Sequence, residues 1–200
     1  MIGALVLRPE PGNRATLDRL HRAGVEAVGL PLFTVRPVAW SVPDIHPYDS
    51  VLFTSAQALR HGGEALARLR HLPAVAVGAA TAAAAEAAGF RVTVTGRADV
   101  AAATAAAAEA GLTRPLHLAG RDRLGVTPAV TVYDSVATDP PPGALTVAAG
   151  RIALLHSPRA ARRFAALIDR DAVPRTRVGL AALSPAVLAA AGDGWSWHAT

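Results

Sequence analysis

The chain has 200 residues, enough for one ordinary domain or two small ones, and 52% of them are hydrophobic. Its 20 basic residues are all arginine and its acidic residues number 15, so the formal net charge of +5 favours anionic partners. Cysteine is absent, which excludes disulfides, thiol nucleophiles and cysteine-ligated metals, and no apolar run is long enough for a transmembrane helix. We therefore expect a cytoplasmic protein that does not bind membranes.

Short apolar strands alternate with helices along almost the whole chain, starting with a strand over residues 2–8 and a helix over 14–24. Gly24 supplies the left-handed turn that ends this helix, and a second strand follows over 25–31. The further strands that we expect cover residues 49–54, 74–78, 91–95, 114–120, 151–156, 176–181 and 195–200. Helices are expected after the first three of these strands, and also over 158–170 and 184–191. This alternation is typical of parallel sheets with helices on their faces and predicts the α/β fold class.

Two proline-rich stretches interrupt this alternation. Residues 31–47 and 129–144 have the pattern of strands, but their prolines suit edge strands or linkers more than central strands. We therefore expect the chain to leave a first α/β domain, build a second, similar α/β domain and return. The expected segments are 1–36 and 137–200 for a discontinuous, flavodoxin-like domain 1, 48–128 for the inserted domain 2, and 37–47 and 129–136 for two linker strands that pair as a β-ribbon.

An internal repeat connects the two expected domains. It pairs "DSVLFTSAQALRHG" with "RIALLHSPRAARRF", and "PAVAVGAATAAAAEAAGF" with "TRVGLAALSPAVLAAAGD". The strand-to-helix corners carry Ser55 and Ser157 in the first pair, and Thr81 and Ser184 in the second. Such a hydroxyl caps the following helix, and the same helix start can bind a carboxylate or a phosphate. Because ligands of α/β sheets bind at the carboxyl ends of the strands, we expect these corners to line a cleft between the domains.

Catalytic signatures are largely missing from the sequence. It contains none of the GxxxxGK[ST], GxGxxG, GxSxG or HExxH motifs, and its histidines lack metal-ligand spacing, so we expect no metal site and no covalent nucleophile. His156 stands beside Ser157 at a strand end, where either a general base or a local packing role fits. Tyr133, in the second linker strand, is either an ordinary strand residue or a group at the mouth of the cleft.

The distribution of the arginines distinguishes between anionic partners. They are spread along the chain, and no basic run interleaved with aromatic residues is present, so nucleic acid is not expected. A small molecule with several carboxylates fits better, because each guanidinium can bind one carboxylate through paired hydrogen bonds.

Six segments in their order and spacing resemble the uroporphyrinogen-III synthase family over almost the whole chain. They are "LVLRPEPGNRATLDRLHRAGVEAVGLPLFTVRPV", "YDSVLFTSAQALR", "AVAVGAATAAAAEAAGF", "LHLAGRDR", "VTVYDSVAT" and "RIALLHSPRAARRF". The resemblance implies two α/β domains joined by a β-ribbon, acting as a monomer without cofactor or metal. It implies that hydroxymethylbilane, a linear tetrapyrrole with eight carboxylates, loses its terminal hydroxyl as water and closes with inversion of ring D. One departure is that domain 2 leaves no room for a helix after the strand at 114–120.

The resemblance also implies roles for single residues. Tyr133 matches the tyrosine proposed to assist the leaving hydroxyl. The positions that match the substrate-binding cleft are Arg8, Thr54, Ser55, Gln57, Gly78, Thr81 and Ser157, with Arg121 as a weaker carboxylate contact and Ser184 added by the internal repeat. In this reaction the activated end must meet the substituted carbon of ring D instead of its free neighbour. Positioning should therefore contribute more than acid–base chemistry.

Two alternatives to the enzyme stay open. A non-catalytic two-domain module that binds a tetrapyrrole or another polycarboxylate would share the basic cleft, and only turnover separates it from the synthase. A sugar- or amino-acid-binding module would instead have a neutral cleft.

Overall fold

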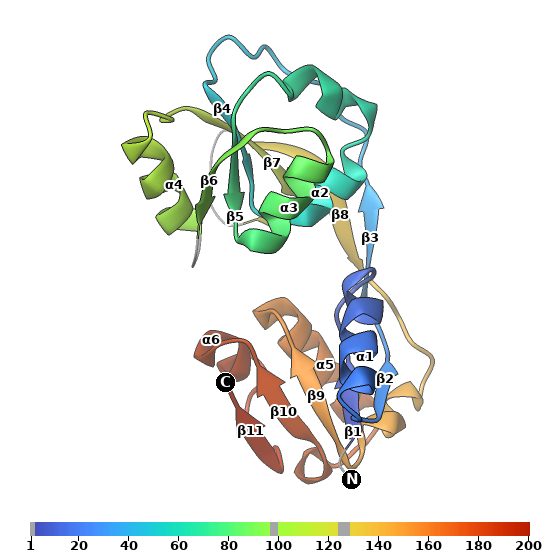
Figure 1. The fold of residues 1–200 in the computed structure, drawn as a ribbon. Helices are drawn as coiled ribbons and strands as arrows, with labels where there is room; N and C mark the ends of the chain where they lie inside the picture. The colour runs from blue at the N-terminus through green and yellow to red at the C-terminus, as the bar shows by residue number, and fades with distance from the viewer. Residues whose placement is uncertain (1–2, 97–99, 124–128) are drawn as a thin grey trace. The chain divides into compact units, whose positions relative to one another are not determined.

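The computed structural model describes residues 3–96, 100–123 and 129–200 (Figure 1). Contacts between residues divide the chain into two compact units. Unit 1 comprises Met1–Thr34 and Val136–Thr200, and unit 2 comprises Val35–Ser135. Each unit has its own sheet and its own hydrophobic core.

Unit 1 is built on a parallel sheet of five strands in the order β11-β10-β9-β1-β2. These strands are β1 (Gly3–Val6), β2 (Ala27–Gly29), β9 (Arg151–Leu155), β10 (Gly179–Ala182) and β11 (Trp197–Ala199). All four residues of β1 are buried, as expected for a central parallel strand covered on both faces. Numbered along unit 1 alone, the strand order is 2-1-3-4-5, which is the flavodoxin-like order.

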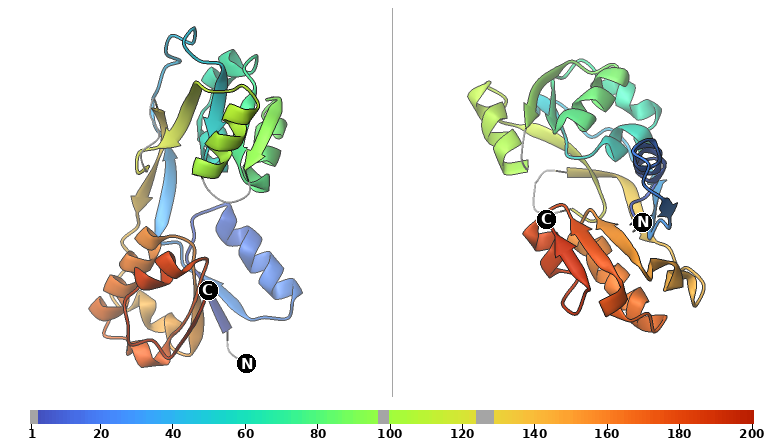
Figure 2. Two further views of the ribbon diagram at one scale, coloured as in Figure 1. Left: turned by 90° about the vertical axis from the view of Figure 1, so that its left-hand side faces the viewer. Right: turned by 60° about the horizontal axis from the view of Figure 1, so that its bottom comes forward.

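The helices of unit 1 cover both faces of this sheet. They are α1 (Gly12–Arg22), α5 (Pro158–Arg170) and α6 (Pro185–Ala189), with short 3-10 turns η2 (Ala144–Ala148) and η3 (Arg175–Arg177). The chain moves in opposite directions from β1 to β2 and from β9 to β10, so right-handed crossovers place α1 and α5 on opposite faces (Figure 2). Helix α5 packs a row of apolar residues, including Phe164 and Ile168, into the core.

Unit 2 has a sheet of six strands in the order β3-β8-β7-β4-β5-β6. The strands are β3 (Phe33–Pro37), β4 (Ser50–Phe53), β5 (Ala74–Val77), β6 (Val92–Gly96), β7 (Pro115–Gly120) and β8 (Ala129–Ala137). Its helices are α2 (Ala56–His61), α3 (Ala79–Ala87) and α4 (Val100–Glu109), with the 3-10 helix η1 (Glu64–Leu69). The pairs β4–β5, β5–β6, β4–β7 and β7–β8 are all parallel.

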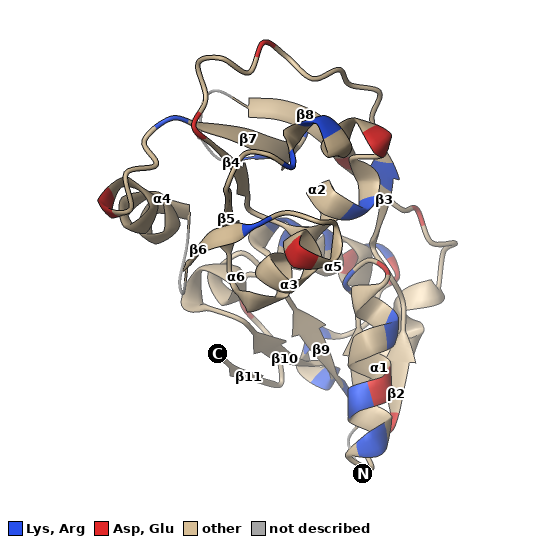
Figure 3. Ribbon diagram, turned by 45° about the horizontal axis from the view of Figure 1, so that its top comes forward, with Lys and Arg blue, Asp and Glu red and all other residues tan. Residues whose placement is uncertain are grey.

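The two faces of the unit 2 sheet carry cores of different size. One face holds Val51 and Phe53 in a large cluster that includes residues of α2, η1 and α3. The other holds Leu52 and Val75 against Ala103 of α4, in a small cluster. The second cluster is small because α4 is built almost entirely of alanine, and alanine buries little apolar area. Both α3 and α4 also carry few charges, in contrast to α1 (Figure 3).

The segment of residues 37–47 differs from the prediction of a linker strand. The strand that pairs with β8 is β3, which ends at Pro37, and residues 38–49 form neither helix nor strand. The prolines of this segment lack the N–H group that a sheet requires. Its apolar side chains instead pack on the core of unit 2, where Trp40 Nε1 donates a hydrogen bond to the Gly62 carbonyl at 2.9 Å.

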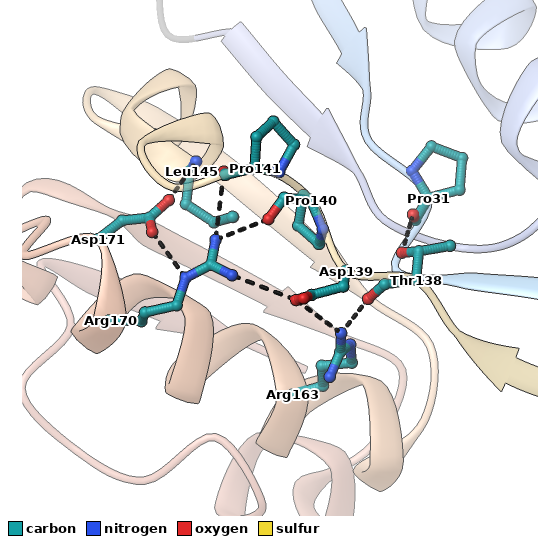
Figure 4. Close-up of polar contacts among 9 residues, drawn as sticks. All are labelled: Pro31, Thr138, Asp139, Pro140, Pro141, Leu145, Arg163, Arg170 and Asp171. Atoms are coloured by element: carbon teal, nitrogen blue, oxygen red, sulfur yellow. Dashed lines mark hydrogen bonds and ion pairs between the residues drawn. The ribbon is translucent and has the colours of Figure 1, made fainter.

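Arginines of α5 hold the segment that follows β8 (Figure 4). Arg163 donates to the Thr138 carbonyl and lies 3.8 Å from the carboxylate of Asp139. Arg170 donates to Asp139 at 3.3 Å and to Asp171 at 2.8 Å. Asp171 also accepts a backbone N–H from this segment at 2.9 Å. The hydrogen bonds from Arg170 and from the backbone lower the pKa of Asp171 below its ordinary value, so it is a carboxylate at neutral pH.

Candidate functional site

The carboxyl ends of parallel strands bring the predicted site residues to one edge of each sheet. Open α/β sheets bind ligands at this edge, where neighbouring strands have connections that run in opposite directions. In unit 1 this switch point lies between β1 and β9, and in unit 2 it lies between β4 and β7. We call the residues at or just after these ends the unit 1 edge, with Arg8, His156, Ser157 and Ser184, and the unit 2 edge, with Thr54, Ser55, Gln57, Gly78, Thr81 and Arg121. The unit 2 edge also includes Tyr133, which lies within β8 and stands opposite Gly120 at the end of β7.

Three of the predicted hydroxyl corners are helix caps. Ser55 accepts a hydrogen bond from the backbone N–H of Gln57 at 3.2 Å. Ser157 accepts one from the N–H of Ala160 at 3.2 Å, and Ser184 accepts one from the third residue of α6 at 3.3 Å. Pro158 stands at the first position of α5, where its missing N–H costs nothing. The capping role predicted for these serines is confirmed.

Thr81 does not cap a helix, and that prediction was wrong. It lies inside the first turn of α3, it is 6% exposed, and its backbone N–H bonds to the Gly78 carbonyl. The cap of α3 is Gly78, whose φ of +88° turns the chain into the helix three residues earlier. Gly78 therefore occupies the place that Ser184 has in unit 1. A glycine offers no side-chain acceptor to the first helix amides, so Gly78 leaves more room for a ligand.

Arg8 lies two residues after the end of β1 and is half-buried. Its guanidinium lies over Gly12, since a Cβ at Gly12 would stand 2.5 Å from Arg8 Nε. The buried side chain of Asn13 donates to the carbonyls of Val6 and Arg8 at 2.8 and 3.0 Å, which fixes the turn after β1. Sequence reasoning missed Gly12 and Asn13, although "PGN" marks a turn whose polar residue often bonds the backbone.

His156 is a neutral neighbour of Arg8 at the unit 1 edge. Its pKa lies below the ordinary histidine value, mainly because of burial and then because of the nearby charges of Arg8 and Arg19. Its Nδ1 lies 3.2 Å from the Leu154 carbonyl, a contact that acts in the opposite direction on the pKa. Sequence reasoning also missed Leu183, which precedes Ser184, is 71% exposed and offers apolar surface at this edge.

Tyr133 packs over a glycine at the unit 2 edge. It pairs with Gly120 at an irregularity between β7 and β8, and a Cβ at Gly120 would stand 2.7 Å from the ring. The ring centroid of His61 lies 6.5 Å away. The backbone N–H of Arg121 donates to the Tyr133 carbonyl at 3.0 Å. Gly120 therefore lets the phenol lie across the carboxyl end of β7.

Arg121 already has an anionic neighbour. Its Nε lies 2.9 Å from a carboxylate oxygen of Asp134, and its own side chain is 60% exposed. A substrate carboxylate would have to share this guanidinium with Asp134.

A contact that sequence reasoning missed joins β4 to β7. Thr54 Oγ1 lies 3.1 Å from Nε2 of His117, which is 1% exposed. His117 stands opposite Leu52 in the register of the two strands. A polar residue in the middle of the apolar segment "PLHLAG" was the available signal.

The described ranges, 3–96, 100–123 and 129–200, contain no group of three or more His, Cys, Asp or Glu residues that could hold a metal ion. Within the same ranges, every helix is too short or too polar to cross a membrane.

A family model described as uroporphyrinogen-III synthase HemD matches residues 15–198. The chain belongs to the uroporphyrinogen-III synthase family. Members of this family are cyclising lyases of haem biosynthesis, and the match spans both units. None of the curated proteins matches the sequence significantly.

Solved structures of uroporphyrinogen-III synthases share the fold. The Helicobacter pylori uroporphyrinogen-III synthetase is 13% identical, with a TM-score of 0.65 over 100% of this chain and 93% of that one. A mutant uroporphyrinogen III synthase from Thermus thermophilus is 14% identical, with a TM-score of 0.54 over 99% of this chain and 92% of that one. At such identities the likeness supports the mixed α/β fold with parallel sheets, while the family model assigns the family.

Proposed function

We propose that this chain cyclises hydroxymethylbilane to uroporphyrinogen III, releasing one water and inverting ring D. The observation that carries the proposal is the family match over residues 15–198. Each unit also has, at its switch point, polar or charged groups of a kind that can bind carboxylates, which supports the proposal. We propose that the inserted two-domain arrangement, with β3 and β8 as the connecting strands, lets both edges bind the substrate.

Binding of the carboxylates is the first task in the proposed reaction. At the unit 1 edge, Arg8 supplies a guanidinium, the start of α5 capped by Ser157 supplies a positive dipole end, and Ser184 supplies a hydroxyl. At the unit 2 edge, Gly78 opens the start of α3, and Thr54 and Ser55 supply hydroxyls next to Gln57. Burial and the charges of Arg8 and Arg19 lower the pKa of His156, so it adds less positive charge to this edge than an ordinary histidine would.

Proton transfer is the second task, and we assign it to Tyr133. The hydroxymethyl group must leave as water, so its oxygen needs a proton, while electrons of the attached pyrrole expel it. The phenol of Tyr133 can donate a hydrogen bond or proton to that oxygen. The cationic end then bonds to the substituted carbon of ring D, and after rearrangement the ring loses a proton, which replaces the one that left with the hydroxyl as water.

The conformation in which the linear tetrapyrrole is held decides which carbon of ring D reacts. Bond formation at the free carbon of ring D would give the type I isomer without rearrangement. Orienting the substrate contributes more than acid–base chemistry here, because both carbons are reachable in solution.

The test is the isomer of the product. Hydroxymethylbilane is supplied to the purified chain, and the product is oxidised to the porphyrin and separated by chromatography. We expect the type III isomer, formed faster than the spontaneous reaction. Type I isomer alone, at the spontaneous rate, would reject the synthase and favour a non-catalytic module that binds polycarboxylates. We also propose that the protein is a monomer and needs no cofactor. Light scattering tests the monomer, and turnover by the metal-free protein tests whether a metal is needed.

A further inference from the structure

The contact between His117 and Thr54 lies at the switch point of unit 2. β4 continues through α2 to β5 on one side, and β7 continues to β8 on the other, so these two adjacent strands diverge in their connections. Thr54 is the first residue after β4 and stands directly before the capping Ser55. His117 therefore contacts the hydroxyl that stands where a doubly wound sheet binds its ligand.

Hydrophobic packing does not explain why a histidine occupies position 117. It lies in β7, between β8 and β4, and its neighbours Leu116 and Leu118 both belong to the large core cluster. Side chains alternate along a strand, so His117 points to the opposite face, where Leu52 stands opposite it. Burying a polar ring costs free energy unless it is hydrogen-bonded, and the 3.1 Å contact with Thr54 supplies such a bond.

The direction of this hydrogen bond decides what Thr54 can do. A hydroxyl has one proton to donate, and a carboxylate can only accept. If Nε2 of His117 accepted the Thr54 proton, that oxygen would present only lone pairs to a carboxylate. If Nε2 carries a proton and donates it, the Thr54 hydroxyl is free to donate to the substrate.

We infer that His117 is a positioning residue in its Nε2–H form, which donates to Thr54 so that the Thr54 hydroxyl donates to a substrate carboxylate. This inference rests on the proposed function, because that function supplies the carboxylate ligand. It assigns a role to a residue that never touches substrate, and it adds no charge to the site.

The first measurement reads the tautomer directly in the wild-type protein. Long-range ¹H–¹⁵N correlation spectra distinguish the Nε2–H and Nδ1–H forms of each histidine ring, and the signals of His117 are those lost in His117→Gln or His117→Asn. We expect the Nε2–H form. The Nδ1–H form would overturn the inference whatever the activity of the protein.

The second measurement is a double-variant cycle with turnover and binding as readouts. We expect Thr54→Val and His117→Leu each to raise KM for hydroxymethylbilane about tenfold, as loss of one hydrogen bond to a charged group predicts, with kcat changed less than about twofold. The double variant should be no worse than either single one, because His117 acts only through Thr54. Effects that simply add would overturn the inference.

Conservative variants separate this role from a structural one. His117→Gln keeps an N–H donor near the place of Nε2 and should retain KM within about threefold, and Thr54→Ser keeps the hydroxyl and should do the same. A His117→Gln variant that folds, as judged by circular dichroism, yet binds as poorly as His117→Leu would contradict the inference.

A third readout does not depend on turnover. Uroporphyrin III serves as a polycarboxylate probe, and its Kd should rise about tenfold in Thr54→Val and His117→Leu. Failure of wild-type turnover would reject the proposed function alone, while the tautomer and this Kd would still decide the inference. An unchanged Kd in Thr54→Val would overturn it.

Discussion

The edges of units 1 and 2 share a repeated strand-to-helix corner but differ in the side chains around it. Both units turn from a strand into a capped helix at Ser55 and Ser157, and each serine accepts one hydrogen bond from the first turn. Around these shared caps the residues differ. The unit 1 edge has the guanidinium of Arg8 beside a histidine with a lowered pKa. The unit 2 edge instead has a guanidinium already paired with Asp134, a buried histidine bonded to a hydroxyl, and a phenol over a glycine.

This difference suggests a division of roles, in which the repeated caps stabilise the fold and the unrepeated residues act on the substrate. The repeat supplies capped helix starts, and those are common to both units. In the proposed function, residues outside the repeated pattern, above all Arg8 and Tyr133, supply the charge and the proton. If the comparison is right, changes at unrepeated residues should affect binding or catalysis, and changes at the caps should affect stability in both units alike.

The largest expected effect is on Tyr133. Tyr133→Phe removes the phenolic proton donor while keeping the ring over Gly120, so kcat should fall by several-fold to about a hundredfold, within or just below the range of a general acid. Steady-state rates of type III isomer formation measure it. Tyr48→Phe is the matched control, because Tyr48 packs on the core of unit 2 outside the edge. Unchanged turnover in Tyr133→Phe would make Tyr133 a packing residue.

The second largest expected effect is that of replacing Arg8, which should weaken substrate binding. Arg8→Gln removes a guanidinium from the switch point of unit 1, so KM should rise about tenfold while kcat changes little. Arg22→Gln makes the same change of charge at the other end of α1, where Arg22 is exposed, and should leave KM within about twofold. Equal effects of the two variants would mean that only net charge matters.

The caps should give smaller and equal effects on stability. Ser55→Ala and Ser157→Ala each remove one bond to a helix N–H and should lower the free energy of unfolding by about 1 kcal/mol. Urea denaturation followed by circular dichroism measures the change. Replacement by glycine should cost only a few tenths of a kcal/mol. A loss confined to one of the two units would contradict the idea of a shared scaffold.

The smallest expected effect is a pH dependence at His156. Its folded pKa lies below the unfolded value, so the unfolded state binds a proton first as pH falls. Its contribution to stability is complete above the unfolded pKa of about 6.5 and is lost below it. Melting temperatures between pH 8 and pH 5 should therefore fall less in His156→Gln than in wild type. Because His156 is only half-buried, the difference should be small, and parallel curves would contradict the assigned pKa direction.

Several parts of the structure could be predicted from sequence because local patterns control them. Helix α5 begins and ends where expected, since Ser157 and Pro158 mark its start and its apolar residues repeat with helical spacing. The parallel strands follow from short apolar runs between helices. Thr81 was misjudged because a glycine can cap a helix without a hydroxyl, and Gly78 is recognised only by its positive φ.

Residues 37–47 show the limit of pattern reading. Their alternation predicted a linker strand, yet Trp40 bonds to Gly62, which stands 22 positions along the chain, and the segment covers the core. Periodicity shows which side chains lie on the same side of a segment, but not the surface against which they pack. The functional assignment of Arg8 and Tyr133 came from resemblance, and their substrate contacts remain predictions.

The sequence by itself determined the α/β class, the repeated capped corners and the basic charge, because strands, helix caps and net charge depend on neighbouring residues or on composition alone. The tertiary structure decided which strands lie side by side, and thus where the switch points fall. It placed His117 against Thr54, 63 positions away in the chain, and Gly120 beneath Tyr133. Such contacts depend on sheet order and register, which no local pattern encodes.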